Sequence, residues 1–280
     1  MSAICCDVCP RGCRLKDGAV GACKARANVD GAIRPTGYGR ITALAIDPVE
    51  KKPLACWNPG STVLSVGGYG CNLRCPWCQN HAISQVGEDG VGWREVAPSQ
   101  LADLAVRANT QDERMLGVAY TYNEPLVCME FVRDTALLVR EAGLKNVLVS
   151  AGCVSEGVVR EVAPLIDAAN IDLKSFRPET YRSLGGNLRV VQRCIEILAT
   201  TPSCHVEVTM LVVPGVNDTA EEMDALAAWV ATIDESIPLH VSRFHPAWRK
   251  WDCGPTPVAD VYALAEVARA RLRNVFTGNC

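Results

Sequence analysis

The chain has 280 residues, which is enough for one large α/β domain or for one domain with a small appendage. Its 28 basic and 31 acidic side chains are well mixed and give a net charge of −3, so nothing predicts a nucleic-acid surface. The apolar runs are far too short to span a membrane, and the first residues lack the pattern of a signal peptide. We therefore expect a cytoplasmic protein with neither nucleic acid nor membrane as a partner.

The N-terminal part of the chain differs in pattern from the rest. Residues 1–35 are rich in Cys, Gly and Arg and show no helical period, so they need something other than an apolar core to fold. Strand-like runs follow at 41–46 and 62–66, with a proline-rich connection between them. We predict a small Cys-rich N-terminal segment with a strand extension at 1–55 and a core domain at 56–280.

From residue 62 onward, strand-like and helix-like segments alternate. Strands are expected near 62–66, 117–121, 146–150, 170–174, 205–213 and 239–244. Helices are expected near 98–109, 125–142, 155–164, 187–200, 219–233 and 257–271. Repeated β-then-α order predicts a parallel sheet covered by helices. Six such units predict an α/β fold of the partial (β/α)6 TIM-like barrel type.

Polar residues recur at every second position in two of these strands. They are Asn170, Asp172 and Lys174 in one strand and His205, Glu207 and Thr209 in the other. Because strand side chains alternate between the two faces, each set lies on one face, and in a barrel that face lines the lumen. The alternative is that these strands are edge-like and turn their polar face to water.

Fifteen cysteines are unusual for a chain of this length without a secretion signal. In a reducing compartment, clustered cysteines indicate thiolate ligands for a metal, whereas single ones are mostly small buried residues. Two clusters stand out, and the remaining seven cysteines are scattered. The clusters are Cys5, Cys6, Cys9, Cys13 and Cys23, and then Cys71, Cys75 and Cys78.

The second cluster follows the first expected core strand and two glycines. Thiolates with this spacing can each bind a different iron of a [4Fe–4S] cube, which leaves the fourth iron without a protein ligand. The preceding glycines let the backbone bend tightly near the cluster. A zinc site completed by His81 is the alternative, but structural zinc sites more often pair two short-spaced couples of ligands. We therefore predict an iron–sulfur cluster at Cys71, Cys75 and Cys78.

The C-x3-C-x2-C spacing, with Trp77 before the last cysteine and a strand before the first, resembles the radical SAM superfamily. Further stretches occur in order along nearly the whole chain and resemble the radical SAM proteins of the AmmeMemoRadiSam system, which are relatives of pyruvate formate-lyase activating enzymes. They are Cys-Pro-Arg-Gly-Cys near the N-terminus, Ile-Asp-Pro-Val-Glu-Lys-Lys-Pro-Leu at 46–54, Thr-Tyr-Asn-Glu-Pro at 121–125, Ile-Asp-Leu-Lys-Ser-Phe at 171–176, Val-Pro-Gly-Val-Asn-Asp at 213–218 and Ser-Arg-Phe-His-Pro at 242–246.

This resemblance implies a radical SAM barrel that reductively cleaves S-adenosylmethionine (SAM) to a 5′-deoxyadenosyl radical, which abstracts hydrogen from a substrate. It further implies that Trp77 lies against the adenine, that Asn123 and Glu124 bind SAM, with Glu124 accepting from its amino group, and that Asp172 and Lys174 lie near its carboxylate and ribose. From the residues alone, Trp77 is also an ordinary core aromatic, Glu124 a helix N-terminal charge and Asp172–Lys174 a local ion pair.

Weaker candidates for facing SAM or substrate are His205, Glu207, Arg243 and His245, since buried histidines are mostly satisfied core residues. In the N-terminal cluster, Cys6, Cys9, Cys13 and Cys23 supply four thiolates and Cys5 is a spare. A structural zinc site, an auxiliary iron–sulfur cluster and free thiols all fit this spacing.

We predict an oxidoreductase of the activating-enzyme type, whose substrate is a protein or a small molecule and whose electron donor is a flavodoxin or a ferredoxin. The alternative is an iron–sulfur electron carrier or a zinc-binding module without catalysis. Against that alternative stand Glu124 and the polar strand faces, because a carrier needs no SAM pocket.

Overall fold

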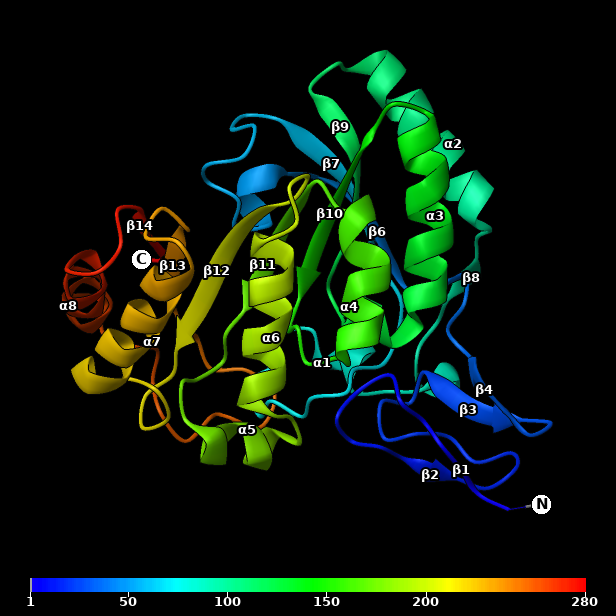
Figure 1. Ribbon diagram of the computed structural model, residues 1–280, viewed down its shortest axis with the longest axis horizontal. Helices are drawn as coiled ribbons and strands as arrows, with labels where there is room; N and C mark the ends of the chain where they lie inside the picture. The colour runs from blue at the N-terminus through cyan, green and yellow to red at the C-terminus, as the bar shows by residue number, and fades with distance from the viewer. Residues whose placement is uncertain (1) are drawn as a thin grey trace.

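The computed structural model describes residues 2–280, and its centre is one eight-stranded sheet with the order β14-β13-β12-β11-β10-β9-β7-β6 (Figure 1). Neighbouring strands from β7 through β14 pair in parallel, and β6 pairs with β7 in antiparallel fashion. The strands are β6 (Ala43–Pro48), β7 (Thr62–Gly67), β9 (Met115–Tyr120), β10 (Lys145–Ser150), β11 (Ala168–Asp172), β12 (His205–Val212), β13 (Leu239–Arg243) and β14 (Val275–Gly278).

Helices connect successive parallel strands and cover the outer face of the sheet. These are α2 (Pro98–Gln111), α3 (Met129–Glu141), α4 (Glu156–Val162), α6 (Leu188–Ala199), α7 (Ala220–Ile233) and α8 (Val258–Arg269). Two short helices, α1 (His81–Ser84) and α5 (Pro178–Leu184), lie near the carboxyl ends of the strands (Figure 1). The prediction of a parallel sheet covered by helices is confirmed. In the part of the chain from residue 2 to 280, no helix is long and apolar enough to cross a membrane.

The local signals at helix starts act as the sequence predicts. Pro98 is the first residue of α2, where its missing N–H removes no helical hydrogen bond. Thr219 caps α7 by accepting a hydrogen bond from the Glu222 N–H at 3.3 Å. Gly185 ends α5 with a φ of +77°, so the Gly-Gly pair there is a helix break.

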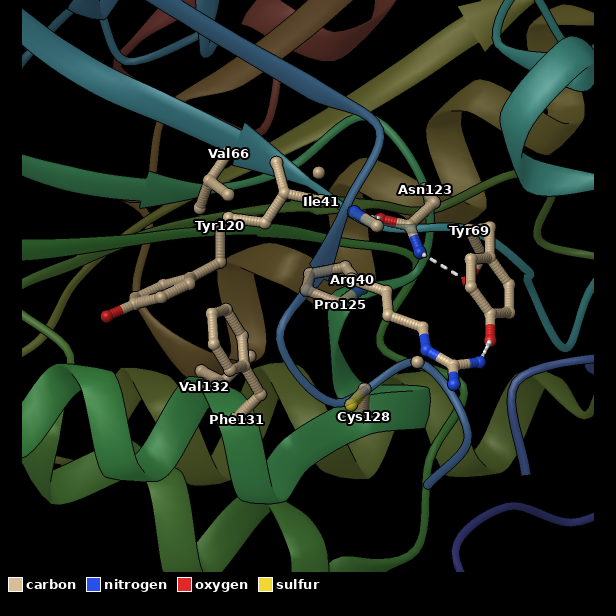
Figure 2. A pocket seen from close by; sticks show the side chains of 13 residues that line it. Arg40, Ile41, Val66, Tyr69, Tyr120, Asn123, Pro125, Cys128, Phe131 and Val132 are labelled. Carbon is tan, nitrogen blue, oxygen red and sulfur yellow. Dashed lines mark hydrogen bonds between the residues drawn. The ribbon is translucent and has the colours of Figure 1, made fainter. Parts of the chain in front are cut away.

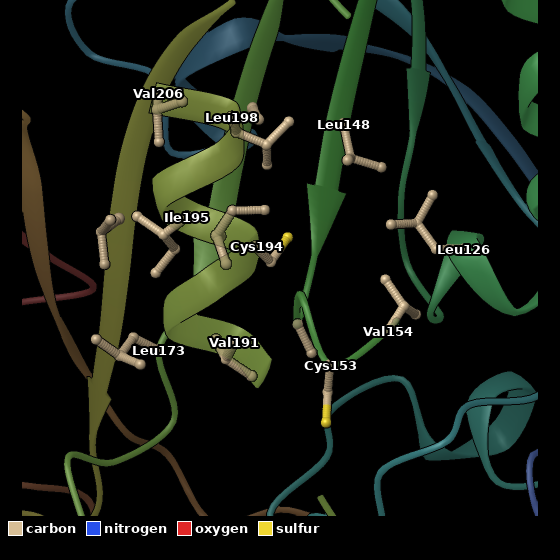
Figure 3. Close-up of a cluster of buried hydrophobic side chains, with 14 of the residues drawn as sticks. Leu126, Leu148, Cys153, Val154, Leu173, Val191, Cys194, Ile195, Leu198 and Val206 are labelled. Atoms are coloured by element: carbon tan, nitrogen blue, oxygen red, sulfur yellow. The ribbon is translucent and has the colours of Figure 1, made fainter. Parts of the chain in front are cut away.

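Alternation along the strands divides the side chains between two apolar cores. The larger core lies between the sheet and the helices, and Figure 3 shows part of it, with Ile195 and Leu198 of α6 beside Val206 and Leu148. Ile171 and Leu173 belong to this outer core, so the polar residues between them face the other way.

The second core lies on the opposite side, which we call the inner face of the sheet. Here Val63, Ala119, Val147 and Ala168 pack against Val49 and Leu54, which come from the connection between β6 and β7. Residues 49–57 of this connection, which begins with the short 3-10 helix η1 (Val49–Lys51), are called the plug segment. The plug segment therefore covers part of the inner face, including Val63 and Ala168 near the N-terminal ends of β7 and β11.

Two hairpins form most of the Cys-rich N-terminal segment, and a third small sheet follows it. The pairs are β1 (Ile4–Cys5) with β2 (Arg14–Leu15), β3 (Arg26–Val29) with β4 (Ala32–Pro35), and β5 (Arg40–Ile41) with β8 (Arg94–Glu95). In Figure 1 the hairpins lie beside α1, near the carboxyl ends of the core strands. Arg26 is buried and forms a two-pronged ion pair with Glu130 of α3, at 2.9 and 2.7 Å. This pair joins the segment to the core.

Several elements were not expected from the sequence, namely α1, α5, β8, β14 and the two N-terminal hairpins. Strand β6 pairs with β7 at the edge of the main sheet, although it falls in the predicted segment 1–55. The division of the chain at residue 55 remains a prediction.

Candidate active site at the cysteine loop

The three cysteines lie in one loop, residues 67–80, which leaves the carboxyl end of β7 and is called the cluster loop. Gly70 turns the chain with a φ of +82°, and a Cβ atom there would lie 2.4 Å from the carbonyl oxygen of Cys23. Beyond this turn, the Cys71 N–H donates to that same carbonyl oxygen at 3.1 Å. A glycine is therefore required where the N-terminal segment and the cluster loop touch.

Of the cluster-loop cysteines, Cys75 is buried, and Cys71 and Cys78 are half-buried. Burial, the Glu124 carboxylate and the Cys75 thiol raise the pKa of Cys71 well above its ordinary value. Burial raises the pKa of Cys75 to about 11, although Lys174 acts in the opposite direction. Ionising these thiols together is costly without a positive partner, so the donor set suits a metal cluster that would offset the charge.

Two further contacts concern the ligand geometry. The sulfur of Cys71 accepts a backbone hydrogen bond from Leu73 at 3.4 Å, and the sulfur of Cys78 lies 3.2 Å from the hydroxyl of Ser84. Among residues 2–280, no three His, Cys, Asp or Glu side chains lie close enough together to bind a single metal ion.

Asn123 braces the turn that precedes the cysteines. Its side-chain amide donates to the carbonyl oxygens of Tyr69 and Gly70 at 3.1 and 3.0 Å and accepts from the Gly68 N–H at 3.2 Å. Figure 2 shows Asn123 beside Tyr69, at one wall of a cleft of about 410 Å³ that reaches Phe131 of α3. The lining of that cleft contains none of the three cluster-loop cysteines, so the cleft lies behind the turn.

Glu124 is almost fully buried and already has three hydrogen-bond donors. Its carboxylate accepts from the Ser150 hydroxyl at 2.8 Å, the Ala151 N–H at 2.9 Å and the Leu126 N–H at 3.1 Å. Burial raises the pKa of Glu124, and these donors oppose the increase. It thus caps the 3-10 helix η3 (Pro125–Cys128) and ties it to the end of β10, which matches its reading as a helix N-terminal charge.

Asp172 and Lys174 form an ion pair of 2.8 Å at the carboxyl end of β11. Burial opposes charge on Lys174, but Asp172 and the nearby Cys75 thiol keep its pKa above the ordinary value. The predicted pair therefore lies at the same edge of the sheet as the cluster loop, where the strands have their carboxyl ends. Trp77 is buried in the outer core at 6% exposure, the environment of an ordinary core aromatic.

Two of the weaker candidates lie at the end of the sheet opposite to the cluster loop, and the other two bind elsewhere than to that loop. His205 and Glu207 lie at the start of β12, where Glu207 binds the Ala55 and Cys56 N–H groups of the plug segment. At the other end, the Arg243 guanidinium donates to the Thr256 carbonyl oxygen at 2.7 Å, and His245 is exposed. Glu207 is thus a satisfied structural carboxylate rather than a group that faces SAM.

A cluster of three polar side chains, Asp47, Lys52 and Tyr122, on the inner face beneath Gly67 was not predicted from the sequence. Tyr122 has a φ of +72°, and its hydroxyl donates to Asp47 at 2.7 Å. The buried Lys52 ammonium lies 2.7 Å from Asp47 and 4.8 Å from the centre of the Tyr122 ring. The stretches 46–54 and 121–125, to which these residues belong, were noted in the sequence, but nothing within either stretch predicts that the two are in contact.

The cysteine loop, the acceptor Glu124 and the Asp172–Lys174 pair follow β7, β9 and β11 at the carboxyl-end edge of one parallel sheet. The sequence model of the Radical SAM superfamily matches residues 65–230, which contain all of these groups. The chain belongs to the radical SAM superfamily. Members of this superfamily use a [4Fe–4S] cluster and SAM.

This radical SAM protein is similar to several known proteins. An uncharacterized protein of Methanocaldococcus jannaschii is 36% identical over 98% of this chain and 80% of the relative. The pyruvate formate-lyase-activating enzyme of Clostridium pasteurianum is 24% identical over 63% of this chain and 72% of the enzyme. A 4-hydroxyphenylacetate decarboxylase activating enzyme of Clostridioides difficile is 24% identical, but the match spans only 41% of that enzyme.

Among solved structures, QueE from Escherichia coli is similar in fold, with a TM-score of 0.56 at 15% sequence identity. That likeness covers 85% of this chain and 92% of QueE. The radical SAM α/β fold is therefore shared over most of the chain. The identity is too low to carry more than the fold.

Proposed function

We propose that this radical SAM protein is an enzyme whose Cys71, Cys75 and Cys78 hold a [4Fe–4S] cluster. When bound, such a cluster supplies the electron that cleaves SAM reductively to a 5′-deoxyadenosyl radical, which abstracts hydrogen from the substrate. The observation that carries the proposal is the placement of the three cysteines in one loop at the carboxyl end of β7, with the Asp172–Lys174 ion pair at the carboxyl end of β11 in the same sheet.

Side chains of the neighbouring strands are proposed to position SAM. Lys174 and Asp172 are a paired cation and anion, which suits the carboxylate and the ribose hydroxyls. Glu124 is a buried acceptor for an ammonium group, and its three present donors hold its oxygens in place. Asn123 keeps the glycine turn in position, and Trp77 is proposed to lie against the adenine.

The finer assignments rest on the ordered motifs and on the names of the relatives. We propose membership in the AmmeMemoRadiSam system and a curved, partial (β/α)6 TIM-like barrel. The substrate is proposed to be a protein, as for the activating enzymes, with a small molecule as the alternative. An oxidoreductase of this type takes its electron from a flavodoxin or ferredoxin, and we propose a cytoplasmic location. A second metal, zinc or an iron–sulfur cluster, is proposed at the N-terminal cysteines.

Anaerobic reconstitution with iron and sulfide, followed by dithionite and SAM, tests the proposal. We expect a brown protein that forms 5′-deoxyadenosine, measured by mass spectrometry, and a Cys75→Ala variant that forms none. Cys280→Ser is the matched control, since Cys280 is an exposed thiol far along the chain, and it should behave as the wild type. Wild-type protein that binds iron at the cluster loop but never cleaves SAM would instead support an electron carrier, and zinc alone would support a zinc-binding module.

A further inference from the structure

Four of the five N-terminal cysteines are gathered by the backbone around one point. The Cys6 N–H donates to the Cys13 carbonyl oxygen at 2.9 Å, which closes the turn that contains Cys9. The Ala22 N–H donates to the Cys13 sulfur at 3.5 Å, which brings the neighbouring Cys23 to the same turn. Cys9 and Cys23 have raised pKa values because they are buried and lie near the other thiols of this group.

Cys5 does not belong to this group, although it is next to Cys6 in the chain. It is exposed, and its thiol points to the Gly12 carbonyl oxygen at 3.5 Å. Cys6 and Cys23, in contrast, are buried at 6% and 7% exposure. The structure thus separates four gathered thiols from a fifth that serves as a control within the same hairpin.

The four thiols form no disulfide within residues 2–280, where all cysteines are free. Their sulfurs do not lie close enough together to bind a single metal ion, so a bound metal would have to draw them inward by side-chain rotation. A segment built of two short hairpins has little apolar core of its own, and a metal held by four thiolates is a common way to stabilise such a segment.

Two contacts from this segment reach the cluster loop on both sides of Cys71. The carbonyl oxygen of Cys23 accepts from the Cys71 N–H at 3.1 Å. The guanidinium of Arg11, which lies between Cys9 and Cys13, donates to the Asn72 carbonyl oxygen at 2.6 Å. Cys23 thus belongs to the thiol group through its side chain and to the cluster loop through its backbone.

We propose that Cys6, Cys9, Cys13 and Cys23 bind a closed tetrathiolate metal centre, and that Cys23 and Arg11 transmit its order to the cluster loop, so that the N-terminal metal positions Cys71. Cys23 and Arg11 act as positioning residues. The inference rests on the proposed cluster at Cys71, Cys75 and Cys78. It goes beyond that proposal because it makes retention of one centre depend on the other.

The physical reason lies in the hydrogen bonds that hold the backbone of the cluster loop. Asn123 holds the carbonyl oxygens of Tyr69 and Gly70 before the cysteines. The hydrogen bonds from the N-terminal segment hold the backbone that follows, at 71 and 72. Loss of outer contacts of this kind weakens metal binding about 10–100-fold in other metal sites. A disordered N-terminal segment would remove both contacts at once.

The experiment compares Cys13→Ser with Cys5→Ser in the full chain, reconstituted anaerobically. Cys13 belongs to the thiol group, and its hydrogen bonds go to Cys6 and Ala22 rather than to the cluster loop, so its loss is expected to act on the loop through the metal. We expect Cys13→Ser to lose one metal centre per chain, counted as zinc and iron by mass spectrometry. The absorbance of its remaining cluster should bleach at least about tenfold faster in the presence of a chelator. Cys5→Ser should match the wild type in both measurements.

Further variants separate this inference from the proposed function. A Cys71/Cys75/Cys78→Ala triple variant should keep the N-terminal metal, and its loss of cluster iron tests the proposed function alone. Cys13→His offers a replacement ligand and should restore the metal count and slow the bleaching if the centre is zinc. The inference is overturned if Cys13→Ser keeps the metal count of the wild type, or if it loses a metal while its cluster bleaches at the wild-type rate.

Discussion

The Glu207 carboxylate gives a direct test of how the plug segment is held on the sheet. It is fully buried and hydrogen-bonds to the rings of His205 and His240, at 2.9 and 2.5 Å, and to the N–H groups of Ala55 and Cys56, at 3.0 and 2.8 Å. Burial alone would raise its pKa, but these donors outweigh burial and lower the pKa to about 2, from an ordinary value of 4.5.

Because one pKa unit corresponds to about 1.4 kcal/mol, this shift corresponds to roughly 3 kcal/mol of stability at pH 7. A carboxyl group with a lowered pKa gives its full stabilisation above pH 4.5 and loses it as the pH falls toward 2. We therefore expect Glu207→Gln to lower the free energy of unfolding by about 3 kcal/mol at pH 7, and by about 1 kcal/mol less than that at pH 4.

Anaerobic urea unfolding, followed by circular dichroism at both pH values, measures this difference. Glu113→Gln is the control, because Glu113 is exposed, and it should change the unfolding free energy by less than about 0.5 kcal/mol. A cost for Glu207→Gln below about 1 kcal/mol at pH 7, or an equal cost at both pH values, would refute the reasoning.

Three further substitutions test contacts around the cluster loop. Gly70→Ala should cost about 1–3 kcal/mol and reduce the iron content per chain, because φ is +82° and the new Cβ would lie only 2.4 Å from the Cys23 carbonyl oxygen; unchanged iron content would contradict this. Glu124→Gln should destabilise the iron-free protein by about 1–3 kcal/mol in urea, since one of its three donors loses its acceptor, and a wild-type midpoint would argue against that. Arg26→Met should cost about 2 kcal/mol by removing the partner of Glu130, and a double-mutant cycle with Glu130→Gln should show coupling.

Most of the core could be predicted because its signals are local. Each parallel strand is an apolar run bounded by turn residues, and helix starts such as Pro98 and Thr219 carry their own caps. The alternation in 170–174 also placed Asp172 and Lys174 on one face, where they form an ion pair. Short elements were missed because β14 has only four residues and gives almost no periodic pattern.

The β3–β4 hairpin had a signal that the sequence analysis did not use. Asp30 and Gly31 form its two-residue turn with φ values of 52° and 77°, the turn that an Asp-Gly pair favours. The environment of Glu207 could not be predicted in this way. Its backbone partners lie about 150 residues earlier in the chain, so they are set by packing rather than by local pattern.

The order of strands in the main sheet follows the order of the chain from β7 to β14, apart from the small strand β8. Each parallel strand therefore finds its neighbour already made while the polypeptide is still leaving the ribosome. The nascent sheet grows in one direction, and the backbone N–H and C=O groups of its last strand stay unpaired until the next strand is synthesised. Since β14 is the last of these strands and forms an edge of the finished sheet, the longer edges of the preceding strands are exposed to chaperones until synthesis of the domain is nearly complete.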